Sequence, residues 1–205
     1  MQVHNISAKT TRVLNFVRRN IYHCTPKVNA LAYTSLIRPH LEYASAAWDP
    51  YTARDSHQLD IVQRRAARFV KRDYRQITSV SELSSHLAWQ SLEERRKNSR
   101  LSLFYKGLHG LAAVPVRELQ HPTRCTRCSG TDTFTVMSSH VDAYKFSFLP
   151  MTVTDWNALP AFTRAKRSTD SFKKALHKFP DTPADRCWAD TTAAVTADDP
   201  SLDTH

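Results

Sequence analysis

Apolar residues recur at the helical period of 3.6 residues through most of the first half of the chain. A first helix is predicted after Ser7, which could cap it, with an apolar face of Val13, Leu14, Val17 and Ile21. A sharper amphipathic helix is predicted from about Asp55 to Arg72. Its inner stripe consists of Leu59, Val62, Ala66, Phe69 and Val70.

Between these two segments, Thr25 followed by Pro26 indicates the start of another helix. The predicted inner face of that helix consists of Val28, Leu31, Ala32 and Leu36. Pro39 interrupts the pattern, so the stretch is either one kinked helix or two helices that meet near Arg38.

Two capping boxes follow, Ser79 with Glu82 and Ser91 with Glu94. The second predicts a long helix through Leu101, Phe104 and Leu108, which Gly107 and Gly110 end.

The pattern changes in the second half of the chain. Tyr144, Phe146 and Phe148 alternate with polar residues, which predicts a short extended or hairpin segment around residues 131–150. A last helix, which Asp170 could cap, has an inner face of Phe172, Leu176 and Phe179. The composition after Pro180 is typical of a disordered acidic tail.

These elements predict a mainly α fold, a helical bundle with one short extended segment and a disordered tail. The 205 residues, 41% hydrophobic and 23% charged, suffice for one domain or two small ones. We expect a helical domain at 1–110, a connection with the extended segment and terminal helix at 111–180, and the tail at 181–205. Three glycines exclude a G-x-G-x-x-G fingerprint and a P-loop. Without a run of about 18 apolar residues or a signal-peptide core, the sequence predicts a soluble intracellular protein.

The charge is unevenly distributed along the chain. Lys and Arg number 29 against 19 Asp and Glu, and the formal net charge is +10. The excess lies in residues 1–180, because residues 181–205 hold six aspartates and one arginine. Such a basic body favours phosphate-bearing partners or anionic surfaces, although a basic protein without such a partner is an alternative.

Two basic clusters stand out. The stronger one follows the outer side of the predicted helix at 55–72 and consists of Arg64, Arg65, Arg68, Lys71 and Arg72. The weaker one consists of Arg95, Arg96, Lys97 and Arg100. Glu93 and Glu94 partly offset it, so intrahelical ion pairs and phosphate contacts are both open for this cluster.

Candidate metal ligands are few. Cys125 and Cys128 form a single C-x-x-C, and His121 and His140 flank it as weak further candidates. Zinc ribbons usually add a second C-x-x-C or an H-x-x-x-H pair, which these histidines do not form. We therefore expect free thiols rather than zinc, and we assign no catalytic residue.

Five stretches of the sequence together form a family pattern. They are TRVLNFVRRNIYHC, LAYTSLIRPHLEYASAAWDP, LDIVQRRAARFVKRDY, LAWQSLEERRKNSRLSLFYKGLHGL and SFLPMTVTDWNALP. In this order and with these gaps, over roughly residues 5–178, they resemble the C-terminal part of jockey-like non-LTR retrotransposon reverse transcriptases. RPHLEYA, VQRRAARF and the downstream W-N-x-L-P are the most specific words.

The resemblance implies a fragment of an RNA-directed DNA polymerase encoded by a transposable element. In that family the fingers and palm precede this region, and the palm aspartates hold two magnesium ions. The only D-D pair here is Asp198 with Asp199 in the tail, so the chain alone should not polymerise DNA and should need no cofactor. The part present corresponds to the helical thumb and the following connection.

A thumb of this kind would bind template and primer, whether RNA, DNA or a hybrid, through sugar and phosphate without sequence preference. The basic side chains that would contact the nucleic acid are Arg64, Arg65, Arg68, Lys71 and Arg72, with Arg18, Arg19, Arg38, Arg96 and Arg100 as weaker candidates. The other partner would be the missing palm and fingers, and no membrane partner is expected.

Several alternatives remain open. One alternative is an inert retroelement remnant with exposed apolar surface. Another is a small zinc-binding adaptor that uses Cys125 and Cys128. Arg38 either contacts phosphate or pairs with Glu42 one turn later. Tyr43 and Trp48 are expected to pack in the core rather than stack on bases.

Overall fold

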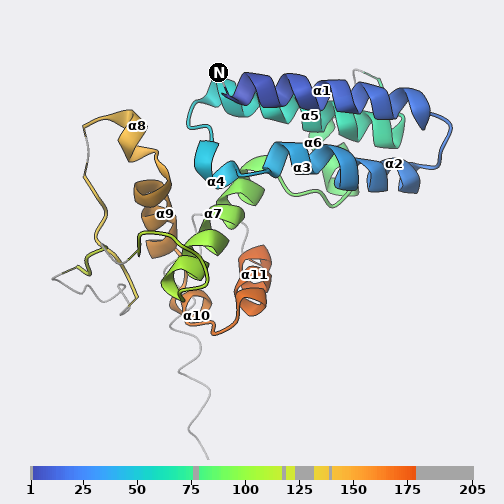
Figure 1. Ribbon diagram of the computed structural model, residues 1–205. Coiled ribbons are helices and arrows are strands. Elements are labelled where there is room, and N and C mark those ends of the chain that lie inside the picture. The colour runs from blue at the N-terminus through green and yellow to red at the C-terminus, as the bar shows by residue number, and fades with distance from the viewer. Residues whose placement is uncertain (1, 76–78, 117–118, 123–131, 139, 179–205) are drawn as a thin grey trace, which may run out of the picture.

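The computed structural model describes residues 2–75, 79–116, 119–122, 132–138 and 140–178, and these residues are mainly helical (Figure 1). The elements are α1 (Gln2–Asn20), α2 (Pro26–Ala32), the π-helix η1 (Tyr33–Ile37), α3 (Arg38–Glu42), α4 (Ser45–Trp48), α5 (Ala53–Lys71), α6 (Val80–His86), α7 (Leu92–Leu108), α8 (Asp142–Lys145), α9 (Phe148–Asn157), α10 (Ala161–Arg164) and α11 (Thr169–Lys178). The predicted mainly α fold is confirmed. No strand occurs within these ranges.

Helices α1 and α5 lie side by side and run parallel (Figure 1). Near their starts, Ser7 Oγ donates to the carbonyl of Gln58 at 3.3 Å. Near their ends, the Arg72 guanidinium donates to the carbonyls of Tyr22 and Cys24 at 2.5 and 2.6 Å. Both predicted apolar faces point inward, and the α5 stripe of Leu59, Val62, Ala66, Phe69 and Val70 is at most 1% exposed.

Segments α2, η1 and α3 follow one another as an almost continuous helical path with a widened turn before Pro39. The Arg38 N–H bonds to the carbonyl of Tyr33, five residues back, as in a π-helix. Proline lacks an N–H, and its ring would clash with the carbonyl four residues earlier in an α-helix. The expected interruption near Arg38 is thus realised as a π turn followed by a new α-helix.

The buried face of this segment differs from the predicted one. Asn29, Tyr33, Ile37 and Leu41 are at most 1% exposed, whereas Val28, Leu31 and Leu36 are 44%, 66% and 53% exposed. The prediction for these three apolar residues is therefore wrong. The inner face repeats every four residues and contains a buried Asn and a Tyr, so a search for aliphatic residues selects the neighbouring face instead.

Tyr33 and Trp48 help to fill the first core, but Tyr43 does not. The Tyr33 ring stacks on Trp89 with 4.0 Å between centroids, and burial raises the pKa of its hydroxyl well above the ordinary value. Trp48 packs against the same core, and its indole N–H donates to the carbonyl of Tyr43 at 2.8 Å. The Tyr43 side chain is 81% exposed, so its predicted core position is wrong.

A second apolar cluster lies between α7, α9 and α11 and the irregular segments that cross them. Its buried members are Leu101, Phe104, Tyr105, Val116, Leu119, Phe134, Val153, Trp156, Phe172 and Leu176. Leu92, at the start of α7, belongs to the first cluster instead. The two cores therefore meet within α7.

The predicted strand around Tyr144, Phe146 and Phe148 is wrong, because these residues lie in α8, in the turn that follows it and in α9. Phe146 stacks on Tyr51 with 5.2 Å between ring centroids. Five alternating residues are too few to distinguish a strand from a turn between two short helices.

Helix starts were predicted with mixed success. Ser91 caps α7 by accepting a hydrogen bond from the Glu94 N–H at 3.1 Å, as its capping box predicts. Ser79 precedes α6 without a side-chain cap, and α1 begins at Gln2 rather than after Ser7. The predicted tail at 181–205 and Phe179 lie outside the described residues. None of the helices described here is long and apolar enough to cross a membrane.

Gly107 packs closely against the segment that follows α7. A Cβ atom at this position would lie 2.8 Å from Val114 Cβ and 3.3 Å from Val116 Cγ1. We predict that Gly107→Ala lowers the free energy of unfolding by about 1–3 kcal/mol, because a Cβ atom so near the backbone cannot move away alone. Urea titration followed by circular dichroism measures this change.

The matched control is Ser99→Ala, at an exposed position of the same helix. It should change stability by less than about 0.5 kcal/mol in either direction. Equal stability of the Gly107 variant and the wild type would contradict the close approach.

Candidate nucleic-acid interface

Four cations occupy the outer side of α5. Arg64, Arg65 and Lys71 are exposed and Arg68 is half-buried. We call these four residues the α5 basic face. In the described part of the chain, none of the four forms an ion pair with a carboxylate.

The periodicity of α5 is what turns these side chains outward. Thr52 Oγ1 accepts a hydrogen bond from the Asp55 N–H at 3.2 Å and begins the helix, and Arg72 ends it with a left-handed φ of 54°. Between them the buried stripe fixes the inner side, so residues 64, 65, 68 and 71 lie on the opposite arc.

Arg72 was grouped with these cations in the sequence, but its guanidinium serves the fold. Besides its hydrogen bonds to the carbonyls at the end of α1, it lies 5.6 Å from the ring centroid of Tyr22. Arg18 lies 4.9 Å from the ring centroid of Tyr74. These contacts bring the last turn of α1, with Arg18 and Arg19, next to the end of α5 and enlarge the positive surface there.

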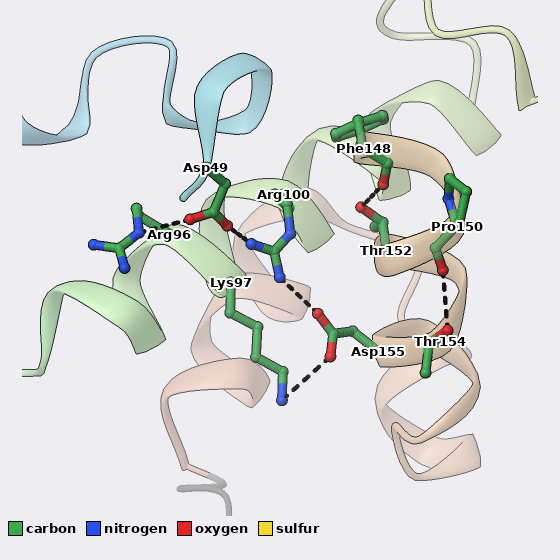
Figure 2. A network of polar contacts seen from close by, with 9 residues as sticks. All are labelled: Asp49, Arg96, Lys97, Arg100, Phe148, Pro150, Thr152, Thr154 and Asp155. Atoms are coloured by element: carbon green, nitrogen blue, oxygen red, sulfur yellow. Dashed lines mark hydrogen bonds and ion pairs between the residues drawn. The ribbon is translucent and has the colours of Figure 1, made fainter. Parts of the chain in front are cut away.

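Arg96 and Arg100 of α7 point into the protein (Figure 2). Arg96 Nε lies 2.7 Å from Asp49 Oδ1, and Arg100 pairs with Asp49 Oδ2 and, at 2.8 Å, with Asp155 Oδ2. The two arginines are 2% and 3% exposed. Burial lowers the pKa of the Arg96 guanidinium, which nevertheless stays charged near neutral pH. The expectation that these residues contact phosphate is therefore wrong for this fold.

This buried ion-pair network joins three distant segments of the chain. Asp49 follows α4, the arginines lie on α7, and Asp155 lies on α9, where Lys97 also reaches it at 3.7 Å. On α9, the hydroxyls of Thr152 and Thr154 donate to carbonyls one turn earlier (Figure 2). The sequence WDP and the basic run of α7 thus form one structural unit.

The residues after Asp155 are structural as well. Trp156 is buried, and its indole N–H donates to the carbonyl of Asp132 at 2.8 Å. The Asn157 side chain pairs with both backbone groups of Phe134, at 3.0 and 2.7 Å. The W-N of the family-like motif therefore holds the irregular segment around residue 134 against the second core.

Glu42 forms ion pairs with two more arginines. Arg38 pairs with it at 3.6 Å, four residues away, and Arg95 binds it through two nitrogens, which raises the pKa of Arg95. The structural alternative for Arg38 is thus confirmed. Carboxylates of other segments pair with all four cations of the second basic cluster.

Two of the four metal-ligand candidates, His121 and His140, lie within the described residues. His121 Nδ1 lies 2.9 Å from the carbonyl of Thr133, and its ring stacks on Phe134, while His140 is exposed. Cys125 and Cys128 lie outside the described residues. Within the described ranges, no group of three or more His, Cys, Asp or Glu side chains could hold a metal ion.

We predict that Asp49→Asn lowers the free energy of unfolding by about 3–5 kcal/mol, because it leaves two buried guanidinium groups short of a counter-charge. Asp142→Asn, at an exposed carboxylate of α8, is the matched control and should cost less than about 0.5 kcal/mol. Denaturant titration of both variants makes the comparison. A loss for Asp49→Asn as small as that of the control would show that the network does not stabilise the fold.

Comparisons of the chain with protein-family models, with curated proteins and with solved structures find no match. The function proposed next is accordingly argued from the charges, contacts and burial described above.

Proposed function

We propose that the protein binds nucleic acid through the sugar–phosphate backbone, with the α5 basic face as the contact surface. The single observation that carries this proposal is that four cations on the outer side of α5 have no carboxylate partner among the residues that the structure describes. A surface of this kind attracts a polyanion and releases its counterions, and it does not read sequence.

The spacing along α5 supports contact with one strand of a duplex or with a single strand. Arg64, Arg68 and Lys71 follow one line along the helix, and a rise of about 1.5 Å per residue places the first and last Cα atoms about 10 Å apart. Three phosphate steps along one strand of B-form DNA advance by a similar distance of about 10 Å. Each cation can therefore meet a different phosphate.

Helix α1 extends the same chemistry. Its outer side carries the exposed residues Lys9, Arg12 and Arg19. Phe16, 61% exposed, lies among them and offers a ring on which a base could stack. Because α1 and α5 pack against each other, these residues form a second set of exposed cations in the same part of the fold.

The family-level part of the proposal rests on the sequence resemblance. It describes the chain as the thumb and following connection of a non-LTR retrotransposon reverse transcriptase, separated from the palm that would hold magnesium. Binding of template and primer would then be the retained property, and catalysis would belong to the missing part. The outward charges of α5 support this proposal. Arg96 and Arg100 do not support it, because they are buried in ion pairs.

We predict that R64Q/R68Q/K71Q weakens duplex binding and flattens its salt dependence by about 2–3 released counterions. Fluorescence anisotropy with a labelled duplex, titrated at several salt concentrations, measures the slope. The matched control is R167Q/K173Q/K174Q, which removes three exposed cations near and on α11 and leaves α5 intact.

Both variants carry the same net charge, so only the location of the cations differs. The control should keep a slope close to that of the wild type. Equal slopes for the two variants would mean that the affinity comes from overall charge, and the assignment to α5 would fail.

The second candidate is an inert remnant, favoured by the exposed apolar residues of α2 and η1. Val28, Leu31 and Leu36 lie uncovered on one segment, and apolar surface of this kind promotes contact with a second copy of the chain. We predict concentration-dependent self-association that L31E/L36E removes. Sedimentation velocity measures it, with L111E/V141E, at two other exposed apolar residues, as the matched control.

A further inference from the structure

A single residue, Gln90, contacts both the end of α11 and the middle of α5. The carbonyl of Gln90 accepts a hydrogen bond from Gln63 Nε2 of α5 at 3.0 Å. The side chain of the same Gln90 lies 2.9 Å from His177 Nδ1 of α11. Gln63 is buried, so this contact lies on the side of α5 that faces the core and not on the α5 basic face itself. The described part of the chain therefore ends, at Lys178, near the helix that carries the α5 basic face.

The sequence that follows has the opposite charge. Residues 181–205 hold one arginine and six aspartates, which are Asp181, Asp185, Asp190, Asp198, Asp199 and Asp203. Three of these carboxylates precede residue 191 and three follow residue 197, so negative charge recurs along the whole segment. The cations of the α5 basic face have no carboxylate partner within the described residues that would compete with this segment.

The segment is long enough to reach the basic face. Twenty-five residues can span up to about 80 Å, and α5, with 19 residues, is about 28 Å long. A segment that begins near the end of α11 can therefore pass around α5 and reach both Arg64 and Lys71.

From this placement we propose that residues 181–205 bind the α5 basic face within the same molecule and compete there with nucleic acid. The second half of this inference rests on the proposed function, because it concerns the regulation of the same surface. Tethering gives the aspartates an effective concentration in the millimolar range. A duplex, with its denser charge, displaces them, whereas weaker polyanions do not.

Competition of this kind has a definite size. When the acidic segment covers the surface in nine of ten molecules, the apparent affinity for an external ligand falls about tenfold. The effect depends on salt, because charges separated by more than a Debye length, about 10 Å at 0.1 M, are screened.

Carbodiimide cross-linking tests the contact without any nucleic acid. In the full chain at low salt, the aspartates of 181–205 should couple to Lys71 more efficiently than to Lys145 of α8, which is also exposed. The Lys71 product should fall in about 0.5 M NaCl and in R64Q/R68Q, which keeps Lys71 but removes its neighbours. R167Q/K173Q is the matched control and should leave the yield unchanged. Equal yields at Lys71 and Lys145 would overturn the contact.

A second experiment tests the competition. The full-length variant with all six aspartates of 181–205 changed to asparagine should bind a labelled duplex about five- to tenfold more tightly than the wild type at low salt. The same change made in R64Q/R68Q/K71Q should have a much smaller effect, because the surface that it uncovers has been removed. An equal gain in both backgrounds would indicate a net-charge effect and overturn the competition.

The two experiments separate this inference from the proposed function. Cross-linking to Lys71 without any duplex binding would support the intramolecular contact and refute the nucleic-acid function. The opposite result is salt-dependent duplex binding that the six substitutions leave unchanged, with no preferred cross-link. It would support the nucleic-acid function and refute the intramolecular contact.

Discussion

The Asp49 carboxylate, held between the guanidinium groups of Arg96 and Arg100, is the interaction on which the arrangement of this fold depends. It connects the loop after α4 to α7, and Arg100 carries the connection on to Asp155 of α9. Taking these charges out of water is costly, so each guanidinium needs its carboxylate at close range. The network therefore fixes how the N-terminal helices meet the helices of the second core.

Helix α7 is the element that both cores share, and its charges and its apolar residues act together. Leu92 contributes to the first core, and Leu101, Phe104 and Tyr105 contribute to the second. The buried arginines lie between these two groups along the helix. A charged link at this point sets the orientation of the two cores more strictly than apolar contact does, because hydrogen-bond geometry is directional.

The basic residues of α5 and of α7 thus have different surroundings. Arg95, Arg96, Lys97 and Arg100 of α7 pair with carboxylates of other segments. The α5 basic face points outward without carboxylate partners in the described part of the chain. The proposed interface is therefore smaller and more localised than the net charge implies. The acidic residues at 181–205 provide a tethered competitor for this surface.

The sequence by itself determined the amphipathic helices whose inner faces are aliphatic. The stripe of α5 follows directly from the 3.6-residue period, and with it the outward position of Arg64, Arg65, Arg68 and Lys71. Only the tertiary structure decided the use of Arg96 and Arg100, because their carboxylate partners stand about 50 residues away in each direction along the chain. The tertiary structure also decided which face of α2 and η1 is buried. The π turn before Pro39 and the buried Asn29 belong to a face that the local apolar pattern does not favour. Helical period is a local property that one segment contains, whereas ion pairing and burial depend on which distant segments the fold brings together.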